Sequence, residues 1–344
     1  MIRSLYWGRA ANASFTHALR SDGENTCASD WRAWQERGGL IWIDLEKPDR
    51  RLLEAVAEVF DLHQLAVTTV MAERSRPKLT TFDHYFILTM YGPKPLPVTS
   101  ERLARETTLD RVEEAELIVG ERFLLTIHDD HMPGLENVWT DHEQSETPPE
   151  DMSAVVHEVM DGVVDRFFPV LDTMVDRVEE IQEAAFVGTG ELLDEARVRE
   201  LFSLKKQLNS LHRILNPQRN AIAVLAREEL PFFRSSGAEF QDIFDHAMRQ
   251  ADMLAVYVDL LVSAREGYLV RVSNVLANAA KMLLAVTLFF AVPTFVFTTY
   301  GMNFDHVPEA SLPIGHALPF LVTLAADGAL FWYFQRRVKL FARS

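Results

Sequence analysis

Two long apolar stretches, separated by a short polar segment, constrain this chain more than any other feature. The first runs from Lys281 to Tyr300 and the second from Ile314 to Phe334, with the polar residues 301–313 between them. Each stretch approaches the ~20 residues that a helix needs to cross ~30 Å of hydrocarbon. The pattern therefore predicts a helical hairpin that spans a membrane.

Charged residues predict the orientation of this hairpin. Arg336, Arg337, Lys339 and Arg343 follow the second apolar stretch, and basic segments of this kind stay on the cytoplasmic side. Two crossings then place both termini in the cytoplasm and the polar loop outside. The first residues contain no apolar signal core, so we expect insertion into the inner (plasma) membrane to depend on the hairpin.

Composition restricts the partners of the rest of the chain. The formal net charge is -16, which makes nucleic acid an unsuitable partner and divalent cations a suitable one. Cys27 is the single cysteine, so the chain has neither a disulfide framework nor a thiolate metal cage.

The N-terminal part has the pattern of a mixed α/β domain. Pro48-Asp49 opens an expected helix, in which apolar residues recur at helical spacing from Leu52 to Phe60. Strand-like runs, rich in β-branched, aromatic and other apolar residues, occur at Ser4–Trp7, Leu40–Leu45, Tyr85–Tyr91 and Leu117–Ile127.

From residue 151 onward the apolar period is helical. We expect one helix from Asp151 to about Phe186, a second over 191–229 that ends before Pro231, and a third from Gly237 to Tyr300. The third helix would be ~96 Å long and too long to be buried by one small domain. The predicted organisation is a cytoplasmic α/β domain (1–150), a cytoplasmic helical stalk (151–280), a first membrane helix (281–300), an external loop (301–313), a second membrane helix (314–334) and a basic cytoplasmic tail (335–344).

The loop between the two apolar stretches carries a distinctive motif. Tyr300-Gly301-Met302-Asn303-Phe304, followed by Pro308-Glu309, resembles the extracellular signature of the CorA family of divalent metal ion transporters, in its magnesium-type branch. Further segments resemble the family in the same order along the chain: Trp42-Ile43-Asp44-Leu45, Leu62-His63, Arg76-Pro77-Lys78-Leu79, Leu124-Leu125-Thr126-Ile127-His128, Asn216-Pro217-Gln218-Arg219 and Asp242-Ile243-Phe244-Asp245-His246.

The resemblance implies a funnel-shaped homopentamer in the lipid membrane, with the first membrane helix of each copy around a central pore. The implied cargo is Mg2+, and many members of the family also carry Co2+ or Ni2+. The resemblance makes Asn303 the best candidate for selectivity at the pore mouth, together with Gly301 and Met302, whereas the alternative is that Asn303 only caps the loop. It also implies that Asp242 helps to form a regulatory Mg2+ site between copies, whose occupancy closes the pore.

The residues themselves support a pore. Steps of three and four along the first membrane helix give a face of small or hydroxyl-bearing residues: Thr298, Thr294, Ala291, Thr287, Leu283 and Ala280. Hydroxyl groups can hydrogen-bond the water shell that Mg2+ sheds reluctantly. Tight helix packing is the alternative explanation of such a face. Asp305 and Glu309 could attract cations to the entrance through their field, or could be solvated acids without a role.

Two features depart from the family pattern. Ala277 and Ala280 occupy positions where the family usually has Asn and Met, which leaves the place of a lower gate open. Asp327 lies inside the second membrane helix, where acids are costly and often functional. Straight helices place Lys281 at ~30 Å and Asp327 at ~22 Å below the outer helix ends. Because lysine can snorkel, we expect an ion pair between them.

An acidic stripe follows the first stalk helix, with spacings of three, four or seven residues. It is either a solvated face or a surface that binds cations with low affinity. Its members are Glu158, Asp161, Asp165, Asp172, Asp176, Glu179 and Glu183.

Other function classes are weaker. His128-Asp129-Asp130-His131 has a composition that suits a metalloenzyme, but it lies at a strand end with no second ligand cluster, which indicates a loop. A Gly-rich phosphate loop is also absent from the sequence. The remaining alternatives are a proton-coupled Zn2+ transporter of the related ZntB branch and a membrane metal sensor that carries no flux.

Overall fold

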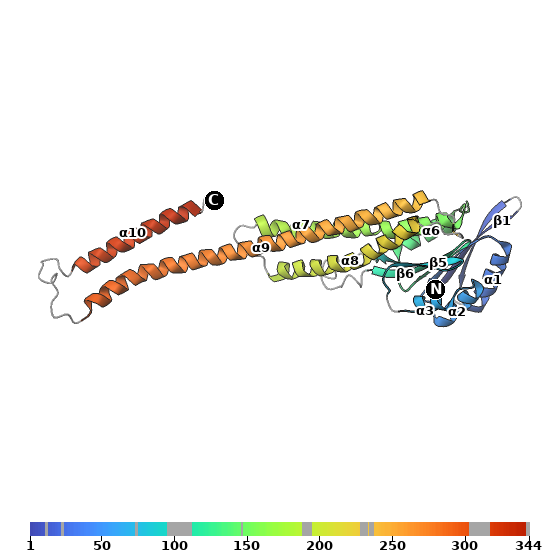
Figure 1. Ribbon diagram of the computed structural model, residues 1–344, viewed down its shortest axis with the longest axis horizontal. Coiled ribbons are helices and arrows are strands. Elements are labelled where there is room, and N and C mark those ends of the chain that lie inside the picture. The colour runs from blue at the N-terminus through green and yellow to red at the C-terminus, as the bar shows by residue number, and fades with distance from the viewer. Residues whose placement is uncertain are drawn as a thin grey trace. The chain divides into compact units, whose positions relative to one another are not determined.

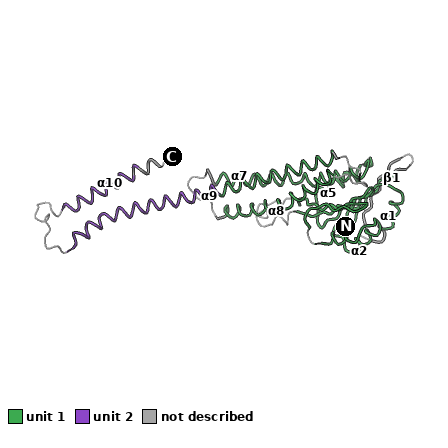
Figure 2. Tube along the Cα trace, in the orientation of Figure 1, with its two compact units in different colours: residues 1–265 green, residues 266–344 purple. Residues whose placement is uncertain are grey.

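A computed structural model of the chain divides into two compact units, residues 1–265 and 266–344, which are coloured separately in Figure 2. The structure describes residues 1–10, 13–21, 24–72, 75–94, 112–145, 147–187, 195–227, 233, 237–302 and 317–341.

Unit 1 is built on one seven-stranded sheet of order β2-β1-β3-β7-β6-β5-β4. The central strands β3 and β7 pair in parallel, and all other neighbours pair in antiparallel fashion. The strands are β1 (Ile2–Ala10), β2 (Ala13–Ser21), β3 (Leu40–Glu46), β4 (Lys78–Thr81), β5 (Tyr85–Pro93), β6 (Val112–Gly120) and β7 (Phe123–His128).

Helices cover both faces of this sheet (Figure 1). Successive strand residues point to opposite faces, so Ile41 and Ile43 of β3 belong to one core cluster and Trp42 to the other. The helices of the first face are α1 (Glu24–Arg37), α2 (Arg50–Val59) and α3 (Gln64–Val70), and those of the second are α5 (Pro133–Gln144) and α6 (Met152–Asp165).

The expected start of α2 is confirmed. The Asp49 carboxylate accepts a hydrogen bond of 2.8 Å from the backbone N–H of Leu52, which satisfies a donor that has no partner within the helix. Leu52, Leu53, Val56 and Val59 are the buried residues of the helix.

The sequence misplaces two boundaries. The run Leu117–Ile127 forms two strands, because β6 ends at Gly120 and β7 begins at Phe123. A Cβ atom at Gly120 would clash with the Phe123 ring, so glycine permits this tight turn. The single helix expected from Asp151 to Phe186 divides at Arg166. Pro169 explains the break, because proline is tolerated in the first turn of a new helix but not in a helix interior.

Long helices form the rest of the chain: α7 (Phe167–Val187), α8 (Glu195–Arg227), α9 (Gly237–Tyr300) and α10 (Leu318–Phe341). In unit 1, apolar residues of α7, α8 and the first half of α9 share one core cluster. Helix α9 has 64 residues, as the sequence predicts, and it continues into unit 2. Helix α10 extends beyond the second apolar stretch and includes the first residues of the basic tail.

Candidate ion path and metal site

Helix α9 combines great length with an apolar C-terminal half. Among the described helices it alone is long and apolar enough to cross a membrane, and α10 adds a shorter apolar stretch, Leu318–Phe334. Large apolar side chains of this half are exposed, including Met282, Leu283, Phe290 and Phe295. A surface of this size and character fits lipid or other helices rather than water.

One side of this half is a shallow concave strip. Thr287, Ala291, Thr294 and Thr298, here called the threonine face, line it between Phe290 and Phe295. These are four of the six residues predicted to line a pore. Leu283 and Ala280 continue the same spacing beyond the concave part.

Two of the three hydroxyl groups of the threonine face donate their protons to the helix backbone. Thr287 Oγ1 donates to the Leu283 carbonyl oxygen at 2.8 Å, and Thr294 Oγ1 donates to the Phe290 carbonyl oxygen at 2.7 Å. Each of these two hydroxyl protons is therefore used inside the helix, while the lone pairs of the oxygen can still accept hydrogen bonds. The water shell of a cation presents donors outward, which these oxygens can accept.

The residues of the loop motif lie at and beyond the end of α9. The backbone N–H of Gly301 donates to the Phe297 carbonyl oxygen at 2.9 Å, and that of Met302 donates to the Thr299 carbonyl oxygen at 3.3 Å. These two bonds cap the C-terminus of the helix. Asn303, Asp305 and Glu309 lie outside the described residues.

Asp327 and Lys281 lie at different distances from a contact between α9 and α10. Phe297 of α9 and Phe320 of α10 pack with ring centroids 5.0 Å apart. From this contact Asp327 is ~10 Å along α10 and Lys281 is ~24 Å along α9. The two residues therefore differ in depth by ~14 Å, and the predicted ion pair between them stays a prediction. Asp327 Oδ1 is buried and has no hydrogen-bond partner in the described part of the protein.

A group of possible metal ligands occurs in unit 1, where α6 meets α9. Asp161, Asp165 and His246 each offer one ligand atom, and these atoms lie within 4.8 Å of one another. His246 Nδ1 is 2.8 Å from Asp165 Oδ1 and 3.5 Å from Asp161 Oδ1. Burial raises the pKa of Asp161, and the charges of Asp165 and Asp242 raise it further. A cation bound here would offset this repulsion.

The donor set of this group limits which metals fit. Two carboxylates suit Mg2+, which prefers oxygen ligands and keeps several waters. An imidazole nitrogen in addition suits Co2+, Ni2+ or Zn2+. Asp242, which the sequence singled out for a metal site, is not one of the three grouped ligands, although its charge acts on Asp161.

Comparison with known proteins assigns the chain to a family. A family model described as "CorA-like Mg2+ transporter protein" matches residues 37–337. The chain belongs to the CorA family.

Individual CorA relatives support this assignment over most of the chain. YfjQ from Bacillus subtilis is 28% identical over 300 residues, covering 85% of this chain and 88% of YfjQ. The cobalt/magnesium transport protein CorA from Thermotoga maritima is 22% identical over 302 residues, covering 86% and 82%. The complete structure of the CorA magnesium transporter from Methanocaldococcus jannaschii shares the fold, with a TM-score of 0.74, 19% identity and 97% coverage of both chains.

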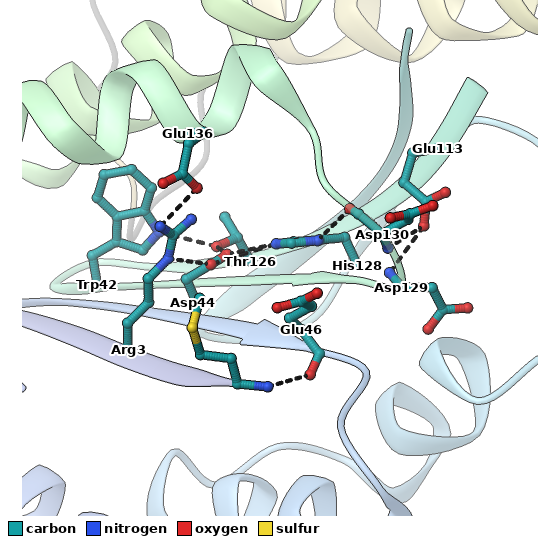
Figure 3. A network of polar contacts seen from close by, with 11 residues as sticks. Arg3, Trp42, Asp44, Glu46, Glu113, Thr126, His128, Asp129, Asp130 and Glu136 are labelled. Carbon is teal, nitrogen blue, oxygen red and sulfur yellow. Dashed lines mark hydrogen bonds and ion pairs between the residues drawn. The ribbon is translucent and has the colours of Figure 1, made fainter. Parts of the chain in front are cut away.

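Membership in the CorA family of transporters excludes the enzyme interpretation of His128-Asp129-Asp130-His131. The structure gives His128, Asp129 and Asp130 a structural role in unit 1 (Figure 3). The backbone N–H groups of Asp129 and Asp130 donate to the Glu113 carboxylate at 3.0 and 2.8 Å. His128 Nε2 lies 3.2 Å from the Asp44 carboxylate.

The Asp44 carboxylate is the centre of this buried network. Arg3 donates to it at 2.7 Å, and Thr126 and His128 also contact it. Burial opposes ionisation of Asp44, but His128 and Arg3 outweigh it and lower its pKa. Burial likewise opposes the charge of His128, but Asp44 outweighs it and raises the His128 pKa.

Sequence reasoning found the members of the metal group without joining them. Asp161 and Asp165 appear in the predicted acidic stripe, and His246 appears in the segment that begins at Asp242. Their spacing of four residues places the two aspartates on one side of α6, but only the packing of α6 against α9 brings His246 to them. The break at Arg166 also places the later acids of the stripe on α7.

Proposed function

We propose that this CorA family member is a homopentameric channel that carries Mg2+ passively across the membrane, driven by the membrane potential. Co2+ and Ni2+ are further cargoes. The observation that carries the proposal is the threonine face, which lies directly before the Gly301-Met302-Asn303 motif. The first membrane helices of five copies would bring their threonine faces together around the path.

The chemistry of the threonine face suits a hydrated ion. Mg2+ gives up its waters reluctantly, so a path that accepts hydrogen bonds from those waters avoids the cost of dehydration. Thr287 and Thr294 keep acceptor lone pairs because their protons are donated to the helix backbone. No carboxylate occurs from Lys281 to Tyr300, and a path without carboxylates releases the ion readily.

The loop motif supplies the selective entrance in this proposal. A ring of Asn303 carboxamides would accept hydrogen bonds from the ion's water shell, and Asp305 and Glu309 would raise the local cation concentration. The basic tail places both termini in the cytoplasm, at the inner (plasma) membrane, with the motif outside.

Cytoplasmic cations would regulate the channel. Asp161, Asp165 and His246, with Asp242 nearby, form the candidate sensor. Bound Mg2+ would stabilise the closed arrangement of the copies, and its loss would shift the population toward the open one. This arrangement gives feedback by the transported ion.

A second candidate function is proton-coupled Zn2+ transport of the ZntB kind. Two observations favour it: the imidazole in the metal group, which suits Zn2+, and Asp327 inside the apolar stretch of α10. The alternative outside the transporters is a membrane protein that senses a metal ion and carries no flux.

The threonine face can be tested by removing its hydroxyls at constant shape. We expect Thr287→Val and Thr294→Val to lower Mg2+ uptake into proteoliposomes at least tenfold, because the apolar face no longer accepts hydrogen bonds from the water shell. Thr299→Val is the matched control, because Thr299 donates to the Phe295 carbonyl oxygen in the same way but lies off the face. Equal uptake by all three variants would overturn the proposed path.

A further inference from the structure

A cationic and aromatic surface occurs near the end of α10. The Arg336 guanidinium carbon lies 5.2 Å from the ring centre of Trp332, one turn earlier in the helix. The Trp332 side chain is 59% exposed. A guanidinium beside an exposed indole ring is a combination that suits the boundary between hydrocarbon and water.

Lys281 of α9 lies at the same depth. From the Phe297–Phe320 contact, Lys281 and Arg336 are each ~24 Å away along their helices. Tyr300 is ~29 Å from Lys281 along α9, which matches the ~30 Å hydrocarbon thickness of a membrane. Two cations from two helices therefore mark one boundary of the hydrocarbon.

Charge is segregated at this boundary. The chain as a whole carries a formal net charge of -16, but no Asp or Glu occurs in residues 267–300 or 328–344. The basic residues in these two segments are Arg271, Lys281, Arg336, Arg337, Lys339 and Arg343. These two segments of the sequence are thus cationic in an acidic protein.

We propose that Lys281, Arg336 and Trp332 bind the headgroup of an anionic phospholipid. The two cations would contact the phosphate oxygens, while the Trp332 ring lies at the level of the glycerol backbone. We favour a lipid over a soluble anion as the occupant, because the cations lie directly beside apolar surface. The exposed indole and the apolar stretches of α9 and α10 can contact acyl chains, which a soluble anion does not have. The proposal depends on the proposed topology only for the assignment to the cytoplasmic leaflet.

Native mass spectrometry of the full chain in mild detergent tests the site. We expect phosphatidylglycerol to bind more tightly than phosphatidylcholine with the same acyl chains. Arg336→Gln should weaken phosphatidylglycerol binding about fivefold, as expected for loss of one cation near the membrane surface. Arg336→Lys should retain most of the binding, and Arg249→Gln, at an exposed position in the unit 1 part of α9, should retain all of it.

Three results would overturn the site. Equal affinity for the two lipids would show that the site does not distinguish an anionic headgroup from a zwitterionic one. An equal loss of phosphatidylglycerol affinity in Arg336→Gln and Arg249→Gln would show that Arg336 does not contact the lipid. Displacement of the lipid by inorganic phosphate at matched concentration would show a phosphate site instead. The measurement does not involve flux, so it can fail while the transport proposal stands.

Discussion

Burial of Glu116 in the sheet should make the folding stability of unit 1 depend on pH. Glu116 lies in β6 opposite Thr89 of β5, and its side chain is almost completely buried. The Thr89 hydroxyl, 2.9 Å from both carboxylate oxygens, is the hydrogen-bond donor to it among the described residues. Burial raises the pKa of Glu116 to about 8.

The size and sign of the effect follow from proton linkage. Below the ordinary value of 4.5 the carboxyl is protonated in both the folded and the unfolded chain. As the pH rises to about 8, the unfolded chain ionises while the folded chain keeps its proton, so the free energy of unfolding falls. At 1.36 kcal/mol per pH unit, the loss over this interval is at most ~5 kcal/mol.

Glu116→Gln removes this pH dependence and leaves the fold intact. Thr89 Oγ1 can accept from one amide N–H of the glutamine, and the other N–H has no acceptor among the described residues, which should cost ~1–3 kcal/mol at pH 5. At pH 9 the variant should be the more stable protein, because it has no charge to bury. Urea unfolding of the full chain in detergent, followed by tryptophan fluorescence between pH 5 and 9, measures both values.

Glu121→Gln, at the exposed β6–β7 turn, is the control and should follow the wild-type curve. Contributions of other groups, including the Asp44–His128 pair, cancel in the difference between wild type and variant. A constant difference between wild type and Glu116→Gln across this pH range would refute the reasoning.

Two further predictions concern charged groups of unit 1. Co2+ at a hundredfold excess over Kd should raise the free energy of unfolding of the wild type by ~2.7 kcal/mol and so raise its melting temperature. Asp161→Asn should reduce this rise in melting temperature; a rise equal to that of wild type would contradict the metal group. Asp44→Asn should destabilise unit 1 by ~1.5–3 kcal/mol near pH 6, since buried Arg3 loses one of its two carboxylate partners and keeps only Glu136. Because the Asp44 pKa is lowered and the His128 pKa is raised, this loss should shrink as the pH falls below about 4 or rises well above 7 in urea unfolding.

Sequence periodicity predicted the elements that repeat one pattern over many residues. The length of α9, 64 residues, follows from an uninterrupted helical period of apolar residues. Asp49 is identified as the start of a helix by its position before apolar residues at helical spacing. Strand β2 and helix α1 were missed. The apolar residues in 13–37 recur too irregularly to predict a strand or a helix from this segment alone.

Contacts between distant segments were beyond sequence reasoning. Asp161 and His246 are brought together by packing of α6 on α9. The distance between their side chains cannot be predicted from the sequence pattern of either helix. The Lys281–Asp327 pair stays a prediction for the same reason: depth counted from the ends of the apolar stretches does not include the register that Phe297 and Phe320 set. The threonine face was found because it depends only on the period of one helix.

Ion uptake into proteoliposomes that contain the full chain tests the central claim most directly. Mg2+, Co2+, Ni2+ and Zn2+ are compared with an imposed membrane potential alone and with an imposed proton gradient alone. The proposed channel predicts Mg2+ uptake that follows the membrane potential, needs no proton gradient and is lost in Asn303→Ala. Zn2+ uptake that requires the proton gradient, with no Mg2+ uptake under either condition, would contradict it.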